Sequence, residues 1–269
     1  MRYALIAGNG RFPVLALESA RQARHEVLVL AIKEEASPEV ESLAWRCHWI
    51  SLGDLSRLID IVKSEGISEI TMAGQVKHAS IFSSIRPDWR LFKLLAALPR
   101  RNTDALIGAV AKVLADEGIR LMDSTLLLKG LLAEEGQLTK RMPTPEEQAD
   151  IVYGRPIANL LSGMDVGQSV VICECACVAV EAMEGTDAAL RRAAGFSNGR
   201  PMTLVKASRR RKHLLYDVPV TGPRSIEVMY ETGATALAID AGRTLLLDRE
   251  RMIECAEAWG ISIVGLPPA

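Results

Sequence analysis

The sequence is poor in aromatic residues and has neither a long apolar run nor an excess of charge of one sign. Aromatic residues make up 4% of its 269 positions, too few for the stacking platforms that bind single-stranded nucleic acid. The 32 basic and 33 acidic residues nearly cancel, which argues against a general nucleic-acid-binding protein. No window approaches the roughly 18 apolar residues of a membrane-spanning helix. We therefore expect a cytoplasmic protein that binds no nucleic acid.

Cysteine is also scarce, and the odd count of five suits a reducing compartment. Three cysteines alternate in "VVICECACVAV", and one strand through Cys173, Cys175 and Cys177 would place all three on one face. Paired thiolate ligands of a metal usually have a two-residue spacer between them. We therefore interpret these cysteines as small buried apolar residues rather than metal ligands.

Strands and helices are expected to alternate along residues 1–125. The apolar runs expected as strands are "YALIAG", "EVLVLAI", "HWISLG" and "ISEITMAG", and "FPVLALESARQARH" and "LSRLIDIVKSEG" have helical periodicity. This alternation predicts a parallel sheet covered by helices on both faces. In such sheets, ligands lie at the carboxyl ends of the strands.

A two-domain α/β protein is the expected architecture. A Rossmann-like parallel-sheet domain that binds nucleotide or phosphate is expected over residues 1–130. The polar stretch 131–145 lacks periodicity and is expected to be a linker, and a catalytic α/β domain is expected over 146–269. Within the second domain, "ATALAIDAGRTLLLD" predicts a hairpin around Ala241 and Gly242.

The motif "AGNGRFP" follows the first predicted strand and precedes a helix. Gly8 and Gly10 allow a tight turn in which backbone amides approach a phosphate, and the helix N-terminus adds positive partial charge near Arg11. A dinucleotide fingerprint would have glycine where Pro13 stands. The loop therefore indicates either a phosphate or nucleotide site or a tight structural turn, and it is weak evidence for a nicotinamide-dependent oxidoreductase.

Two further places offer groups that bind phosphate or sugar. "AGQVKH" ends the fourth predicted strand, where a ligand is expected, and "PRRNTDALI" opens a helix with an N-cap and an acid suited to its positive end. The substrate-binding candidates at these places are Gly74, Gln75, Lys77, Arg101, Thr103 and Asp104. Helix capping alone also accounts for Asp104.

The segment 80–101 interleaves large apolar residues with basic ones. Such a pattern can lie on an anionic membrane or clasp an acyl chain. A surface helix packed on its own sheet has the same pattern, and we favour that ordinary interpretation.

A strand is predicted to run into a helix over "VAVEAMEGTDAALRR", and Glu181, Glu184 and Asp187 crowd the junction. Capping and solvation are one explanation. The other is a divalent cation, because carboxylates hold Mg²⁺ through few protein ligands and several waters. The basic run after Lys206, followed by Asp217, is the densest charge in the chain, and a solvated loop is the ordinary interpretation of such a run. Together with the three acids of the junction, it is a combination that phosphate chemistry can use.

The motifs "GNGRFP", "AGQVKH", "DST", "AVEAMEGTD" and "YDVPVTG" occur in this order in the LpxI-type UDP-2,3-diacylglucosamine pyrophosphatases of lipid A biosynthesis, which the chain resembles from Gly8 to about Gly222. The resemblance implies two α/β domains with the lipid product between them. It also implies Mg²⁺-dependent hydrolysis of UDP-2,3-diacylglucosamine to UMP and 2,3-diacylglucosamine 1-phosphate (lipid X). The matching positions are Gly8, Gly10, Pro13, Gln75, Thr103, Asp104, Glu181, Glu184, Gly185, Thr186, Asp187 and Asp217, the last as an essential aspartate.

The chain departs from the family pattern just before Asp217. His213 and Leu215 stand where the family has an aspartate and an arginine, and the basic run containing Arg210 is expected to replace the missing charge. We expect Asp217, Glu181, Glu184 and Asp187 to be catalytic. Asp217, Glu184 and Asp187 would hold Mg²⁺. Lys206, Thr186 and the glycine loop would bind the diphosphate head.

The expected function is that of a metal-assisted hydrolase of a lipid-linked nucleotide sugar, acting at the interdomain cleft. Its partners would be this substrate and the inner leaflet of the membrane, bound peripherally, and a homodimer is left open. The rival functions are a non-catalytic carrier of a phosphorylated lipid or nucleotide sugar and a nicotinamide-dependent oxidoreductase.

Overall fold

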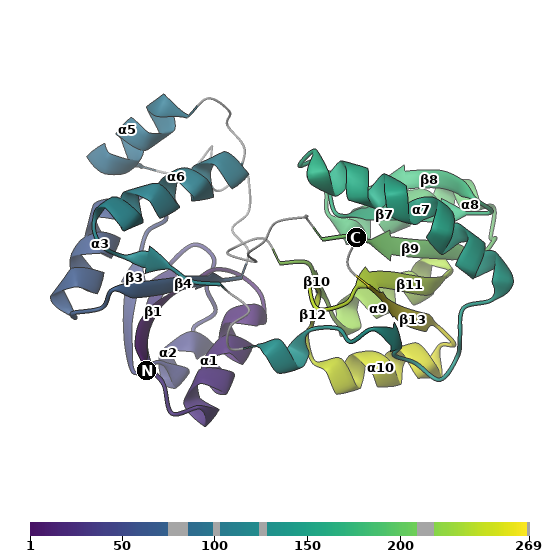
Figure 1. Ribbon diagram of the computed structural model, residues 1–269, viewed down its shortest axis with the longest axis horizontal. Coiled ribbons are helices and arrows are strands. Elements are labelled where there is room, and N and C mark those ends of the chain that lie inside the picture. Colours follow the sequence, from purple (N-terminus) through teal and green to yellow (C-terminus); the bar gives the residue numbers. More distant parts are fainter. Residues whose placement is uncertain (75–85, 99–102, 124–127, 209–217, 268–269) are drawn as a thin grey trace. The chain divides into compact units, whose positions relative to one another are not determined.

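The computed structural model describes the chain apart from residues 75–85, 99–102, 124–127, 209–217 and 268–269 (Figure 1). The described residues form two compact units, Met1–Leu128 and a second that begins at Lys129. Each unit is a layered α/β structure with its own sheet and its own apolar core. The predicted fold class is confirmed.

A five-stranded parallel sheet of order β3-β2-β1-β4-β5 forms unit 1. Its strands are β1 (Arg2–Ala7), β2 (Glu26–Ile32), β3 (Arg46–Ile50), β4 (Glu69–Ala73) and β5 (Arg120–Leu121). Helices α1 (Phe12–Gln22) and α2 (Glu39–Leu43) cover one face, and α3 (Leu55–Ser64), α5 (Trp89–Ala97) and α6 (Thr103–Asp116) lie on the other (Figure 1). This strand order is that of a Rossmann half, in which the chain changes direction between β1 and β4.

The sequence patterns explain why these elements form. In β2 every residue after Glu26 is buried, as in a central parallel strand covered on both faces. In α3, Leu55, Leu58, Ile59 and Val62 are buried at helical spacing and face the core.

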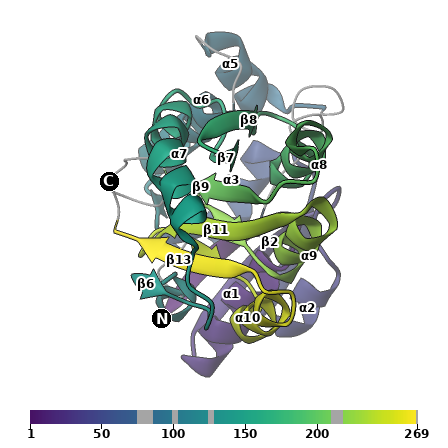
Figure 2. The same ribbon diagram turned by 90° about the vertical axis from the view of Figure 1, so that its right-hand side faces the viewer.

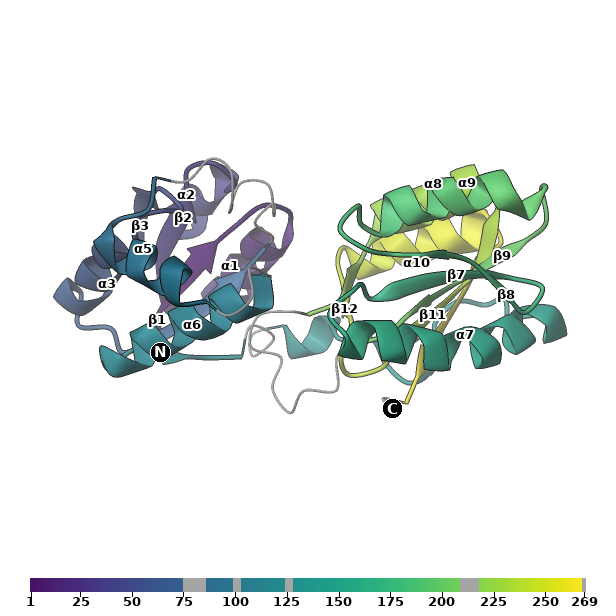
Figure 3. The ribbon, with the colours of Figure 1, turned by 90° about the horizontal axis from the view of Figure 1, so that it is seen from above.

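A six-stranded mixed sheet of order β6-β13-β11-β9-β7-β8 forms unit 2 (Figure 2). Its strands are β6 (Gly136–Gln137), β7 (Ser169–Cys173), β8 (Ala176–Val180), β9 (Met202–Lys206), β11 (Ala234–Asp240) and β13 (Ser262–Leu266). Helix α7 (Pro145–Gly163) lies on one face, and α8 (Thr186–Ser197), α9 (Pro223–Thr232) and α10 (Arg249–Ala258) lie on the other (Figure 3). The short elements are η1 (Lys129–Leu131), β10 (Val220–Thr221) and β12 (Leu245–Leu246).

The hairpin predicted around Ala241 and Gly242 is wrong. Strand β12 pairs in parallel with β10, in a separate two-stranded sheet. Both edges of β11 are already occupied by β9 and β13. The returning chain therefore has no free edge of β11 to pair with.

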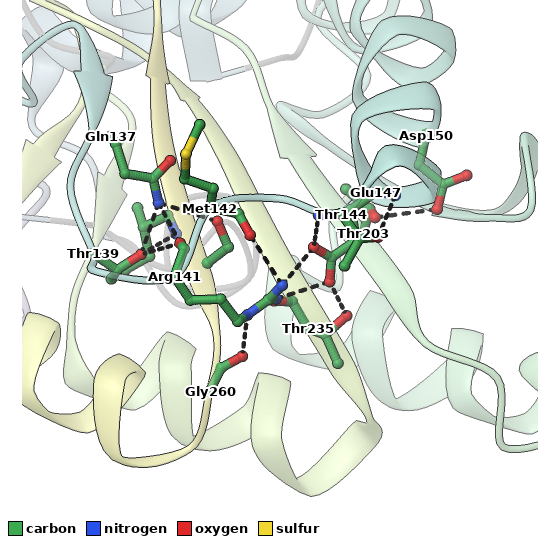
Figure 4. A network of polar contacts seen from close by, with 12 residues as sticks. Gln137, Thr139, Arg141, Met142, Thr144, Glu147, Asp150, Thr203, Thr235 and Gly260 are labelled. Carbon is green, nitrogen blue, oxygen red and sulfur yellow. Dashed lines mark hydrogen bonds and ion pairs between the residues drawn. The ribbon is translucent and has the colours of Figure 1, made fainter.

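The segment 131–145, expected to be a linker, lies within unit 2 and is tied to it by a polar network (Figure 4). Both Arg141 terminal nitrogens donate to the Glu147 carboxylate at 2.8 Å, and Arg141 Nε donates to the Gly260 carbonyl at 2.6 Å. Glu147 also accepts from the Thr144 amide at 2.8 Å and from the Thr235 hydroxyl at 2.5 Å. Thr144 in turn caps the start of α7. The Glu147 carboxylate thus links the segment 131–145, which we call the strap, to α7 and to the sheet.

The three alternating cysteines do not share one strand. The chain turns at Glu174 and Cys175, whose φ angles are 50° and 57°, and the Cys175 amide donates to Asp150 Oδ1 at 2.7 Å. Cys173 is buried as expected, whereas Cys175 and Cys177 are exposed. The expectation of a single face fails because a tight hairpin turn separates Cys173 from Cys177.

Candidate functional site

In unit 1, the two predicted glycine loops meet at the carboxyl edge of the sheet. Strands β1 and β4 are neighbours, and the Gly8 amide donates to the Ala73 carbonyl at 2.8 Å. Gly10 has a φ of 94°, a conformation that favours glycine. The structure therefore brings Gly8, Gly10 and Gly74 together at the point where the chain direction changes, which is where ligands bind in open α/β sheets.

Gly74 is required by close packing as well as by its backbone conformation. Its φ is 90°, and a Cβ atom there would lie 2.5 Å from the Asn9 carbonyl oxygen and 2.9 Å from Pro13 Cγ. Gly74 therefore packs directly against the backbone of the first loop. Pro13, whose ring contributes to this contact, is in the first turn of α1.

We expect Gly74→Ala to destabilise unit 1 by at least about 2 kcal/mol, because a strained φ and an overpacked contact add. The measurement is the midpoint of urea unfolding followed by circular dichroism. Gly10→Ala is the matched control, since its φ is 94° but nothing lies within 4 Å of its Cβ position. Equal losses in the two variants would show that the contact with Asn9 contributes nothing.

Two charged side chains flank the first loop. Arg11 forms an exposed ion pair with Glu39, with Nη1 and Oε1 3.2 Å apart. Asn9 Nδ2 donates at 3.4 Å to Glu35, whose side chain is buried just beyond β2. Glu35 is not among the predicted site residues, because no acid emerges clearly from "KEE" after the second predicted strand. Its signal was present, because an acid just after the second strand is where Rossmann folds contact a ribose.

Several candidate residues lie outside the described parts of the structure. These are Gln75, Lys77, Arg101 and Asp217, together with Arg209, Arg210, His213 and Leu215 of the basic run. Thr103 and Asp104 open α6 as predicted, but their side chains are outside the description. The roles predicted for all of these residues stay predictions.

In unit 2, the acidic junction has the predicted form of a strand running into a helix. Strand β8 ends at Val180, and α8 begins at Thr186 after Gly185, whose φ is 84°. Glu181 turns back toward the helix start, because Thr186 Oγ1 donates to its Oε1 at 2.9 Å. Its other oxygen accepts from the Gln168 amide at 3.3 Å.

Lys206 joins this cluster from the carboxyl end of β9. Its Nζ donates to Thr186 Oγ1 at 3.3 Å and to the Val220 carbonyl at 3.1 Å. The Ser169 hydroxyl lies 3.2 Å from the same Thr186 oxygen. Glu181 and Thr186, predicted from the acidic junction, and Lys206, predicted from the start of the basic run, thus form one connected acid–hydroxyl–ammonium cluster.

The other two acids of the junction pair with arginines. Arg192 Nη2 donates to Glu184 at 2.6 Å and to the Val180 carbonyl at 2.8 Å. The Glu184 backbone amide and the Arg192 side chain lower the pKa of the Glu184 carboxyl. Asp187 lies 3.9 Å from Arg224 Nε. Within the described residues, no group of three or more His, Cys, Asp or Glu side chains is arranged to hold a metal ion.

These features define a two-unit α/β protein whose first sheet has the strand order of nucleotide-binding folds and whose second carries an acid–lysine cluster. The family model of the LpxI N-terminal domain matches residues 2–131, and that of the LpxI C-terminal domain matches residues 134–264. The chain belongs to the LpxI family, as the sequence motifs predict.

The UDP-2,3-diacylglucosamine pyrophosphatase LpxI of Caulobacter vibrioides is 30% identical over 99% of this chain and 98% of its own length. Two solved structures show much weaker similarity to the chain. The biotin carboxylase domain of Hydrogenobacter thermophilus 2-oxoglutarate carboxylase gives a TM-score of 0.29 at 8% identity over 66% of this chain and 35% of its own. The N5-carboxyaminoimidazole ribonucleotide synthetase of Thermotoga maritima gives a TM-score of 0.29 at 13% identity, over 64% of this chain and 33% of its own.

Proposed function

We propose that the protein hydrolyses UDP-2,3-diacylglucosamine to UMP and 2,3-diacylglucosamine 1-phosphate in lipid A biosynthesis. It is a hydrolase acting on a diphosphate bond. The observation that carries this proposal is the match to the Caulobacter pyrophosphatase, which extends over 99% of the chain and 98% of that enzyme. The acid–lysine cluster of unit 2 supplies groups suited to this chemistry.

The reaction joins the oxygen of water to one phosphorus and breaks the bridging P–O bond. Negative charge then develops on the phosphoryl oxygens and on the leaving phosphate. The Lys206 ammonium, held in place by the Thr186 hydroxyl and the Val220 carbonyl, offsets this charge as a fixed cation. Glu181, held by Thr186 and the Gln168 amide, takes the proton of the attacking water.

The glycine loop of unit 1 binds the nucleotide part of the substrate in this proposal. Backbone amides near Gly10, past the Gly8 amide that donates to Ala73, and the N-terminus of α1 would form an electropositive rim for a phosphate. The Glu35 carboxylate is beside this loop and suits the hydroxyls of a ribose. That the substrate is cleaved between the two units stays a prediction.

Magnesium suits the carboxylates of the acidic junction. Mg²⁺ is held through few protein carboxylates and completes its shell with substrate phosphate oxygens and waters. Glu184 and Asp187, whose side chains are 34% and 40% exposed, would hold it together with Asp217. When bound, the ion would neutralise charge on the phosphoryl oxygens.

Peripheral contact with an anionic membrane is proposed through α5. Leu91 and Leu94 face the core of unit 1, whereas Trp89 and Phe92 are 66% and 52% exposed and stack with their ring centroids 5.8 Å apart. Lys93 Nζ is 5.0 Å from the centre of the Trp89 ring. Aromatic rings beside a lysine suit the boundary between headgroups and acyl chains. No helix in the described parts of the chain has the length and apolarity needed to cross a membrane.

Replacing both exposed rings of α5 (Trp89→Ser with Phe92→Ser) is expected to weaken binding to phosphatidylglycerol-containing vesicles about tenfold or more. Sedimentation with vesicles at low salt measures the partition. The control is Phe196→Ser on α8, which removes a ring that is 62% exposed in unit 2. If the α5 variant pelleted with vesicles as fully as the native chain, this surface would not be the membrane contact.

The activity is tested by incubating the purified chain and Mg²⁺ with UDP-2,3-diacylglucosamine and detecting UMP. Release of UMP and the diacylglucosamine 1-phosphate in equal amounts is the expected result. Substrate bound without turnover would instead identify a carrier. A change in NADPH fluorescence on mixing, with no UMP, would favour the oxidoreductase.

A further inference from the structure

Helix α7 carries an apolar ridge on the side that faces away from its sheet. Val152 and Leu160 are each 66% exposed, and Met164, directly after the helix, is 67% exposed. Pro156 is exposed as well. These four residues follow one another at intervals of four, so they line up along the helix as a single i±4 ridge. Tyr153, 42% exposed, widens it.

Charge is missing from this ridge over the whole length of the helix. Between Glu146 at its start and Asp165 just beyond its end, the only charged residues are Glu147, Asp150 and Arg155. The first two are buried, and Arg155 reaches inward to Asp240. A helix exposed to water normally shows charged or polar side chains on its outer side.

The side of α7 that faces the sheet is already packed against it, so the ridge is a second apolar surface of this helix. Ile151 and Ala158 are buried against the sheet. A Cβ atom at Gly154 would lie 2.6 Å from Ile172 Cγ1, which shows how closely helix and strand approach. Among the described elements, α7 is the single helix on its face of the sheet, whereas α8, α9 and α10 share the other (Figure 3).

We propose that two copies of this chain pair through their α7 ridges about a twofold axis. A twofold contact must be self-complementary, and a ridge of evenly spaced i±4 residues fits the groove beside the same ridge on a second helix. The antiparallel arrangement places Val152 opposite the Met164 end of the partner helix. This pairing does not depend on the proposed reaction.

The size and chemistry of the ridge favour a second copy over other occupants. The 19 residues of α7 make a helix about 28 Å long. Contiguous apolar patches beyond a few hundred Å² on a soluble protein mark interaction sites, and a stable dimer takes about 800 Å² from each partner. The ridge supplies the apolar centre of such an interface. An anionic bilayer is the poorer match, because the ridge has no lysine or arginine for the headgroups.

The oligomeric state of the full chain tests this inference. Light scattering after size exclusion, at tens of micromolar, should give twice the 29.3 kDa of one chain for the native protein. Val152→Glu combined with Leu160→Glu should give the mass of one chain, because the twofold axis brings four buried carboxylates together. Both positions are exposed, so the fold should persist, which circular dichroism checks. Phe196→Glu, on the opposite side of the sheet, should leave the dimer intact.

A milder variant grades the effect. Leu160→Ala removes apolar contact without adding charge, and it should raise the dimer dissociation constant about tenfold, measured by sedimentation equilibrium. The inference is overturned if the native chain is monomeric at these concentrations, or if the double glutamate variant stays dimeric. It is likewise overturned if the ridge variant loses vesicle binding while the native chain remains a monomer, since the occupant would then be a bilayer.

Discussion

Lys206→Met is expected to lower kcat/KM for UDP-2,3-diacylglucosamine by about 10²–10³-fold, the loss typical of removing one preorganised electrostatic group from a reaction centre. Lys206 Nζ is anchored by Thr186 Oγ1 and the Val220 carbonyl, so its charge is fixed before the substrate arrives. The effect should fall mainly on kcat, because the charge that the lysine offsets develops in the transition state. Rates of UMP release over a range of substrate concentrations measure both constants.

Two comparisons separate a catalytic role of Lys206 from a structural one. Lys206→Arg keeps the charge and should recover part of the lost rate, whereas a residue needed only for packing would not respond to charge. Lys140→Met removes an exposed lysine whose partner is Glu257, and it should leave kcat/KM unchanged. A Lys206→Met enzyme within threefold of the native rate would mean that the ammonium does not act on the diphosphate.

Glu147→Ala is expected to destabilise unit 2 by about 3–5 kcal/mol, the range for removing one partner of a buried ion pair. The Glu147 side chain is 8% exposed, and its loss deprives Arg141, Thr235 and the Thr144 amide of their common acceptor. The urea midpoint measures the change. Glu146→Ala, which removes the exposed neighbouring carboxylate and its hydrogen bonds at the start of α7, should lower the midpoint far less.

The same carboxylate makes stability depend on pH. Burial alone would raise the pKa of Glu147, but hydrogen bonds from Arg141, Thr235 and the Thr144 amide outweigh it and lower the pKa below its usual value. A carboxyl whose pKa is lower in the folded state stabilises the fold above the unfolded-state pKa, and this contribution is lost as the pH falls through the folded-state value. The difference between native and Glu147→Gln midpoints should therefore shrink below about pH 4. A constant difference from pH 7 to pH 3 would contradict this assignment.

Much of the fold follows from patterns in the sequence. Apolar runs that end in glycine predict the parallel strands of unit 1, and the rule for the carboxyl edge predicts that Gly8 and Gly74 come together. Glu181, Thr186 and Lys206, which form the cluster, are each predicted as site residues from the sequence. Its connections depend on β9 lying beside β7, which no local pattern encodes.

The remaining features depend on partners far along the chain. Glu184 and Asp187 resemble Glu181 in sequence, yet they pair with Arg192 and Arg224, and composition alone does not reveal which acids have such partners. The strap 131–145 looked like a linker because its turns are polar. Its attachment depends on Arg141 meeting the carbonyl of Gly260, more than a hundred residues away.

The described residues of each unit form an apolar core, with Leu28 and Leu114 in unit 1 and Leu204 and Met252 in unit 2. Within the part of the chain that the structure describes, these two clusters share no residue. A substitution that loosens one core should therefore leave the packing of the other core unchanged. The proposed substrate has a nucleotide part and a lipid part, and separate cores let each unit change in sequence without unpacking the other.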